Sequence, residues 1–194
     1  MNKEINKTVT ILNNGGVILY PTDTVWGLGC DATNSEAVST ITKLKGRTDN
    51  QSFIILVHSV EQIEYYIEQV PEIANSLVAL SNTPLTIIYP GARSAAIYED
   101  GLAPQVIATD GTVAIRVVQH PFCTALLQKF NKPIVSTSAN FTGQPAPTSF
   151  TAIDPELRKQ VDFCVDTAFE APATGKPSSI IKLQLNGEVK IIRP

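Results

Sequence analysis

The sequence has few of the residues on which metal sites and disulfide frameworks depend. It holds three cysteines and two histidines in 194 residues, with no C-x-x-C pair. An odd number of widely spaced cysteines is most simply explained by reduced, buried thiols, which predicts a cytoplasmic protein. His58 and His120 have no second ligand at a metal-binding spacing, so no metal site is predicted. No motif points to a Ser-His-Asp triad, although the sequence leaves one open.

Long hydrophobic runs and phosphate-binding loops are missing too. Residues 53–57 form one of the longest apolar runs, far short of the roughly 20 residues that a membrane-spanning helix needs. The polar first residues lack the apolar core and cleavage site of a signal peptide, so we expect none and no membrane contact. Gly175-Lys176 resembles the end of a Walker loop, but Pro177 stands where that loop has Ser or Thr.

Charge and composition limit the function classes further. The formal net charge of −3 gives the whole molecule no general attraction for nucleic acid, so a polyanion would need a local cluster of cations. Hydrophobic residues make up 43% of the chain and charged residues 17%, as in ordinary soluble proteins. We expect a single domain over residues 1–194, which would bury about 70% of its unfolded surface.

The remaining features are organised around residues 15–47. Residues 17–20 are apolar and lie between glycine and proline, which predicts a buried strand that ends at Pro21. Thr22, Asp23 and Thr24 then follow the carboxyl end of a strand, the edge where α/β sheets bind ligands. Thr33 and Glu36 have the spacing of a capping box, which predicts a helix from Thr33 to Gly46.

Three cations, Lys43, Lys45 and Arg47, cluster where this helix is expected to end. Cations are favoured at helix carboxyl ends because they complement the helix dipole. The cluster can equally be part of an anion site, and its spacing alone does not decide between the two interpretations.

The rest of the chain alternates predicted helices and strands. Periodicity predicts helices over residues 3–14 and from Pro121, and strands over 53–57, 85–89, 133–135 and 161–165. Asp110-Gly111 predicts a hairpin between residues 106–109 and 112–118, and Asn186-Gly187 predicts another between 179–185 and 188–192.

Two polar features follow predicted strands or lie within them. Arg116 alternates with Val113, Ile115 and Val117, so it points away from the apolar side of its strand, into solvent or into a cleft. Residues 136–140, S-T-S-A-N, follow the strand at 133–135 and carry four hydrogen-bonding side chains. They could cradle phosphate or carboxylate oxygens, or simply satisfy the backbone of an ordinary loop.

Seven motifs along the chain occur in the order found in the YrdC-like (TsaC) family of threonylcarbamoyl-adenylate synthases, which the sequence resembles over essentially its whole length. They are P-T-D-T at 21–24 with G-L-G at 27–29, K-x-R at 45–47, P-L-T at 84–86, T-V-A-I-R at 112–116, S-T-S-A-N at 136–140 with G-x-P-x-P-T at 143–148, S-S-I-I at 178–181 and I-R-P at 192–194. The resemblance implies an α/β fold, with a twisted mixed sheet and flanking helices around a deep basic cavity. It also implies the short form of the family, without an additional C-terminal domain.

The resemblance further implies an activity and its participants. L-threonine, bicarbonate and ATP would become threonylcarbamoyl-AMP and pyrophosphate, for the threonylcarbamoyladenosine modification of tRNA. Mg²⁺ would accompany ATP, held mostly by phosphates and water. Proteins that transfer the threonylcarbamoyl group to tRNA would act downstream, and tRNA itself is a candidate partner.

Site residues are carried over by the same resemblance. The catalytic residues would be Lys45 and Arg47, which would also contact the phosphates. The threonine side would comprise Thr22, Arg116, Ser136 and Ser179. The nucleotide side would add Thr112, Ser138, Asn140 and Arg193.

The chain departs from the family pattern at several positions, and two other functions remain open. Trp26 replaces the usual tyrosine, Thr48 a proline, Thr83 a glycine, and Ala146 lacks a common hydroxyl. One alternative is an RNA-binding module, which the net acidity disfavours. The other is a carbamoyl-transfer enzyme like the related domains of hydrogenase maturation proteins, which carry acylphosphatase and zinc-finger-like segments absent here.

Overall fold

Strands from distant parts of the chain meet in one sheet. The computed structural model describes residues 1–46 and 53–194. Its strands are β1 (Ile18–Tyr20), β2 (Gly27–Gly29), β3 (Ile54–Val57), β4 (Leu85–Tyr89), β5 (Val113–Val117), β6 (Ile134–Ser138), β7 (Phe163–Cys164), β8 (Ser179–Leu183) and β9 (Val189–Arg193). Within the described residues these nine strands are ordered β7-β1-β2-β6-β3-β5-β4-β8-β9. The pairs β1/β7, β3/β5 and β4/β8 are parallel and the others antiparallel, so the sheet is mixed, as the resemblance implied.

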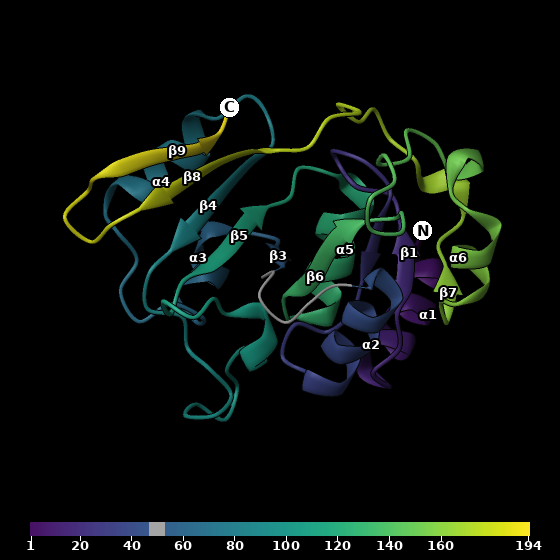
Figure 1. The fold of residues 1–194 in the computed structure, drawn as a ribbon, viewed down its shortest axis with the longest axis horizontal. Coiled ribbons are helices and arrows are strands. Elements are labelled where there is room, and N and C mark those ends of the chain that lie inside the picture. The colour runs from purple at the N-terminus through teal and green to yellow at the C-terminus, as the bar shows by residue number, and fades with distance from the viewer. Residues whose placement is uncertain (47–52) are drawn as a thin grey trace.

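Helices cover both faces of this sheet (Figure 1). They are α1 (Asn2–Asn13), α2 (Ser35–Lys45), α3 (Val60–Ile63), α4 (Ile73–Leu80), α5 (Pro121–Phe130) and α6 (Pro155–Lys159). Short 3-10 turns occur at Pro104–Val106, Phe150–Ala152 and Thr167–Phe169. None of the helices in the described ranges is long and apolar enough to cross a membrane.

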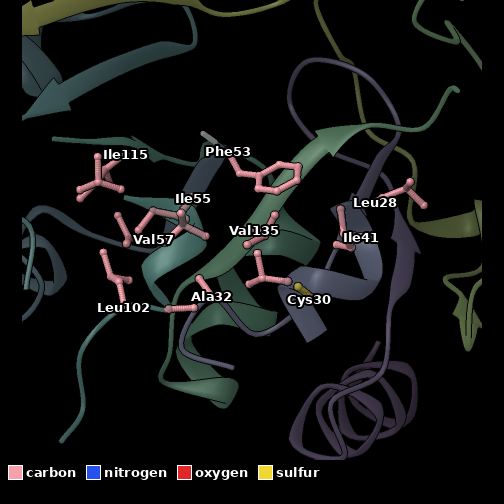
Figure 2. Packing of buried hydrophobic residues seen from close by; sticks show 14 of the residues in the cluster. Leu28, Cys30, Ala32, Ile41, Phe53, Ile55, Val57, Leu102, Ile115 and Val135 are labelled. Carbon is pink, nitrogen blue, oxygen red and sulfur yellow. The ribbon is translucent and has the colours of Figure 1, made fainter. Parts of the chain in front are cut away.

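The larger core lies on one face of the sheet. Ile55, Ile115 and Val135 point to this face from adjacent strands because side chains alternate along a strand. They pack with Ile41 of α2 and with Leu28, as the close view of the core shows (Figure 2). Residues 53–57 and 133–135 thus form the buried strands that their composition predicts.

The other face of the sheet is covered over only part of its area. Leu56 and Ile134 pack beneath α1 and α5, in a second core that includes Leu12 and Phe122. Further along the same face lie Ser136 and Ser138 of β6, with Ile54 of β3, and these residues line a cavity instead. The incomplete helical cover therefore creates the space in which polar strand residues are accessible.

The start of α2 differs from the sequence prediction. Asn34, not Thr33, is the N-cap, and its Oδ1 accepts hydrogen bonds from the backbone N–H of Glu36 (3.0 Å) and Ala37 (3.1 Å). The helix begins at Ser35, which places Asn34 at the N-cap position, and the Thr33 hydroxyl donates to Asp31 Oδ1 at 2.6 Å. The predicted helix end is confirmed, since Gly46 has a φ of 57° in the left-handed region.

The hairpin predicted at Asp110-Gly111 is wrong. The dipeptide does form a tight turn, in which Gly111 N–H donates to Ala108 O. However, Pro104–Val106 before it is a 3-10 turn, and β5 after it pairs with β3 and β4. The long-range partners on both sides of β5 leave no edge for a local hairpin strand. The second predicted hairpin is confirmed as β8 and β9.

Candidate functional site

A cavity of about 340 Å³ opens over the partly covered face of the sheet. Its walls come from segments that are far apart in the sequence but adjacent in the sheet. They are Thr22, Thr24, Val25, Gly27, Ile54, Ile88, Ala114, Arg116, Ser136, Thr137, Ser138, Ala146, Pro177, Ser178, Ile180, Ile192 and Arg193. The predicted residues Thr22, Arg116, Ser136, Ser138 and Arg193 are thus brought together in one hollow.

The floor of the cavity carries a buried ion pair. Arg116 Nη2 lies 3.1 Å from Asp23 Oδ1, and the side chains are 5% and 6% exposed. Asp23 Oδ2 also accepts a hydrogen bond from the backbone N–H of Gln119 at 3.1 Å, which fixes the carboxylate. Of the two interpretations of Arg116, the structure supports a cation that lines a cleft. Its Nε has no acceptor among the described residues and can donate to a bound anion.

The P-T-D-T segment is held in shape by its own hydroxyls. Thr22 Oγ1 donates to Val25 O at 2.7 Å and accepts from the backbone N–H of Thr24 at 3.1 Å. Thr24 Oγ1 lies 2.9 Å from Thr22 Oγ1. Because the Thr22 hydroxyl has its proton committed to Val25, it offers a ligand mainly acceptor capacity, and both threonines contribute to the wall of the cavity.

Arg193 brings a second guanidinium to the cavity. It is the last residue of β9, and its Nε donates to Ser178 O at 2.8 Å. Burial, together with the positive charge of Arg116, lowers the pKa of Arg193. Two like charges that affect each other in this way favour an anion between them.

Lys45 reaches the end of β6 from the last turn of α2. Its Nζ donates to Ser138 O at 2.8 Å, to Asn140 O, and to Asn140 Oδ1 at 3.2 Å. The Thr142 hydroxyl in turn donates to Lys45 O. The ammonium is buried and bound to backbone and amide oxygens beside Ser138, not on the cavity lining itself.

The remaining predicted residues lie beside the cavity or outside the described residues. Thr112 lies in an adjoining hollow of about 280 Å³, which shares Ile88 and Ala114 with the main cavity, and its hydroxyl donates to Asp110 Oδ1 at 2.7 Å. Asn140 Nδ2 donates to Phe141 O at 3.0 Å and Gln144 O at 2.7 Å. Arg47 lies outside the described residues.

Ser178, which the sequence analysis did not select, lies on the cavity wall. Its Oγ is 2.7 Å from Thr86 Oγ1, and it lies two residues before Ile180, another wall residue on the same side. Ser179 has the opposite parity, and its backbone N–H donates to Pro84 O at 3.1 Å. Strand alternation distinguishes the wall serine from its neighbour only if it is known which residue begins the strand.

The ionisable groups below the floor are held in their neutral forms. Burial raises the pKa of the Tyr20 hydroxyl and of the Cys123 thiol, and it lowers the pKa of His120. Cys123 Sγ is 3.0 Å from Pro21 O, and His120 Nδ1 accepts from the Cys123 N–H. A neutral phenol and a neutral thiol are poor nucleophiles, and none of the three residues is on the cavity wall.

The described residues hold no group of three or more His, Cys, Asp or Glu that could bind a metal ion. Asp23, the carboxylate at the cavity floor, is engaged by Arg116. What the cavity offers is a pair of guanidinium groups with hydroxyls on the surrounding walls, an arrangement suited to anionic oxygens.

The comparisons with known proteins assign the chain to a family. The Sua5/YciO/YrdC family, described as "Telomere recombination", matches residues 10–194. The chain belongs to this family. Its relatives include a protein of Saccharophagus degradans named threonylcarbamoyl-AMP synthase, 40% identical over 75% of this chain and 73% of the relative. A protein of the same name from Cellvibrio japonicus is 32% identical over 100% of this chain and 97% of the relative.

Solved structures of the family share the fold. Sua5 of P. abyssi in complex with L-threonine matches 92% of this chain and 50% of that chain, with a TM-score of 0.81 and 28% identity. YciO of E. coli matches 100% of this chain and 89% of that chain, with a TM-score of 0.80 and 25% identity. This chain thus spans about half the length of the P. abyssi Sua5 protein. The agreement confirms the α/β fold that the motifs implied.

Proposed function

We propose that this protein is a threonylcarbamoyl-AMP synthase, a nucleotidyltransferase that converts L-threonine, bicarbonate and ATP into threonylcarbamoyl-AMP and pyrophosphate. The observation that carries the proposal is the convergence of Arg116 and Arg193 with the hydroxyls of Ser136, Ser138 and Ser178 on one cavity. The names of the relatives, and the L-threonine bound to the P. abyssi protein, support the choice of substrate.

Each part of the cavity has a proposed partner. Arg116 binds the carboxylate of threonine through the N–H groups that Asp23 leaves available, with the Ser136 and Ser178 hydroxyls beside it. Arg193 and Ser138 lie on the nucleotide side. Hydrogen bonds to charged groups contribute about 1.5–3 kcal/mol each, so a few such contacts hold an anion without a P-loop.

Lys45 has a proposed role at the phosphates together with Arg47 and Asn140. In the structure its ammonium binds the backbone at Ser138, the residue proposed for the nucleotide. An ammonium has three donors, and a phosphate oxygen can replace one of the protein oxygens around Nζ. Lys45 would then link the nucleotide to the end of β6. Thr112 and Ser179 lie next to the cavity and not on its wall. They would act indirectly, by holding in place the segments that form the wall.

The reaction requires placement and charge neutralisation more than a protein nucleophile. The amine of threonine and bicarbonate form a carbamate and water, and a carbamate oxygen then attacks the α-phosphorus while pyrophosphate leaves. The cavity residues hold three anions close together, exclude bulk water and stabilise the charge that develops on the phosphate. Mg²⁺ comes with ATP, and the hydroxyl-rich walls with one engaged carboxylate fit a cation held mainly by phosphates and water.

Release of pyrophosphate that depends on both threonine and bicarbonate tests this proposal. An Arg116→Ala variant should lose threonine-dependent pyrophosphate release, whereas a Glu156→Gln variant on the exposed surface of α6 should keep full activity. Release from ATP without threonine, or activity with carbamoyl phosphate in place of bicarbonate and ATP, would contradict the proposal. The proposed contact with tRNA should appear as binding that weakens steeply with salt.

A further inference from the structure

A larger cavity, of about 910 Å³, lies at the ends of β3 and β6 that point away from the candidate site. His58, which follows the end of β3, and Lys132, which precedes β6, are on its wall. The candidate site lies at the other ends of these two antiparallel strands, at Ile54 and Ser138. The two cavities share no wall residue, so the larger one is independent of the proposed function.

A buried amide in this cavity has donors without acceptors. Gln62 of α3 is 4% exposed, and its Oε1 accepts a hydrogen bond from the backbone N–H of His58 at 3.0 Å. That bond fixes the orientation of the amide because a backbone N–H needs an acceptor. Gln62 is a wall residue of the cavity, and its buried Nε2 has no acceptor among the described residues. An unsatisfied buried donor costs about 1–3 kcal/mol, which a bound acceptor oxygen would offset.

A second donor comes from a different segment. The backbone of Arg93 donates to Tyr66 O at 2.8 Å, which places Arg93 beside the segment that follows α3. Its guanidinium lies 5.5 Å from the ring centroid of Tyr98. Arg93 Nε is buried and has no acceptor in the described part of the chain. Unsatisfied donors on two wall residues of one cavity call for carbonyl or carboxylate oxygens.

The rim of the cavity has the opposite polarity. Glu61, Glu99 and Asp100 are exposed there, whereas the charge of Lys132 is neutralised by Asp31 at 2.9 Å. The negative charges also act on a buried residue of the cavity wall. The pKa of Tyr66 is raised to about 12, first by burial and then by the nearby Asp31 and Asp100. This polarity disfavours nucleic-acid phosphates and favours a cation.

Aromatic rings complete the rim. Tyr65 is 71% exposed, and Tyr98 is 37% exposed. Both line the cavity, and a cationic group can lie over such rings with a gain of about 0.5–1 kcal/mol at exposed sites. The cavity therefore favours a ligand with acceptor oxygens inside it and a cation at its rim. A peptide backbone with a basic side chain has both.

We propose that this cavity docks a basic peptide segment of a protein partner. Backbone carbonyls of the segment accept hydrogen bonds from Gln62 Nε2 and Arg93 Nε, and a Lys or Arg side chain lies among the rim carboxylates over Tyr65. The volume favours a segment over a free amino acid, because about 910 Å³ is near the upper end for small-molecule pockets.

Calorimetric titration with a blocked tetralysine peptide at low ionic strength tests the proposal, with blocked tetraglutamate as the control peptide. Asp100→Asn and Tyr65→Ala should each weaken tetralysine binding about two- to fivefold. The matched control is Glu156→Gln, since Glu156 is also exposed but lies on α6, at the other end of the molecule from α3 (Figure 1). Tetraglutamate should not bind.

A Gln62→Glu variant separates specific docking from general charge attraction. It keeps an oxygen for the His58 N–H but removes the Nε2 donors and adds negative charge. Docking through Gln62 predicts binding about fivefold weaker at pH above neutrality, whereas simple attraction predicts tighter binding. Tighter binding in this variant, no binding to the unchanged protein, equal weakening by Glu156→Gln, or free lysine binding as tightly as tetralysine would each overturn the proposal.

Discussion

Replacing Asp23 with alanine is expected to destabilise the protein more than any loss of a surface charge. Arg116 would keep its charge in a site where its side chain is 5% exposed. Breaking a buried ion pair by removing one partner costs about 3–5 kcal/mol, because the remaining charge is left without compensation. For a domain of this size each kcal/mol lowers Tm by about 2–4 °C, so Tm should fall by roughly 6–20 °C.

Three further variants show whether the ion pair is the cause. Asp23→Asn keeps an acceptor for the Gln119 N–H, so it should be about 1 kcal/mol less damaging than Asp23→Ala. Glu156→Ala breaks an exposed pair with Lys159 and should cost no more than about 1 kcal/mol. A double variant, Asp23→Leu with Arg116→Met, removes both charges and should recover most of the stability. It should release no pyrophosphate, because Arg116 is proposed to bind threonine.

Urea denaturation followed by circular dichroism measures the free energy of unfolding of these variants, and the pyrophosphate assay measures their activity. A loss in Asp23→Ala no larger than the roughly 1 kcal/mol of the surface control would refute the reasoning. So would a double variant less stable than Asp23→Ala, since the cost would then come from lost packing and not from the unpaired charge.

Four smaller predictions follow from single contacts. Ser178→Ala should reduce threonine-dependent turnover more than Ser179→Ala, because only Ser178 lines the cavity, and equal effects would contradict the placement. Lys45→Met should lower both turnover and Tm, since three protein oxygens lose their donor; an unchanged Tm would speak against these contacts. Asn34→Ala should cost about 0.5–2 kcal/mol of unfolding free energy in urea, through loss of the α2 cap. Hydrogen bonds from Lys182 and Thr112 lower the pKa of Asp110 to about 2. The stabilisation by Asp110 is therefore present above its unfolded pKa and is lost as the pH falls through about 2. Asp110→Asn should flatten the dependence of Tm on pH between these limits, and an unchanged slope would contradict the shift.

How far the sequence predicts the site is well illustrated by Arg116. Alternation in T-V-A-I-R correctly separates it from the apolar side of β5, because that rule depends only on the local backbone. Alternation does not say what faces the arginine. Its partner, Asp23, comes from a segment after β1, and only the order of strands in the sheet brings the two together.

The errors have the same origin in tertiary contacts. Asp110-Gly111 has the local conformation of a tight turn, with a φ of 75° at Gly111, but a hairpin also needs a free neighbouring strand. Parallel β3 and antiparallel β4 occupy both edges of β5. Similarly, Thr33 has the spacing of a capping residue, but the backbone N–H and the hydroxyl of Thr33 both bind Asp31, and the helix begins one residue later, with Asn34 as its cap.

The local charge of the candidate site and the charge of the whole molecule have opposite signs. Among the described residues, Arg116 and Arg193 are on the cavity wall and Asp23 is paired with Arg116, whereas the chain as a whole carries −3. Charges on the outer surface are screened beyond about 8 Å at physiological salt, but buried groups are screened much less. The cations of the cavity therefore dominate for an anion that has already entered it, while long-range attraction of a polyanion stays weak. This difference in range is the physical reason why the cavity suits small anionic substrates better than a nucleic-acid surface.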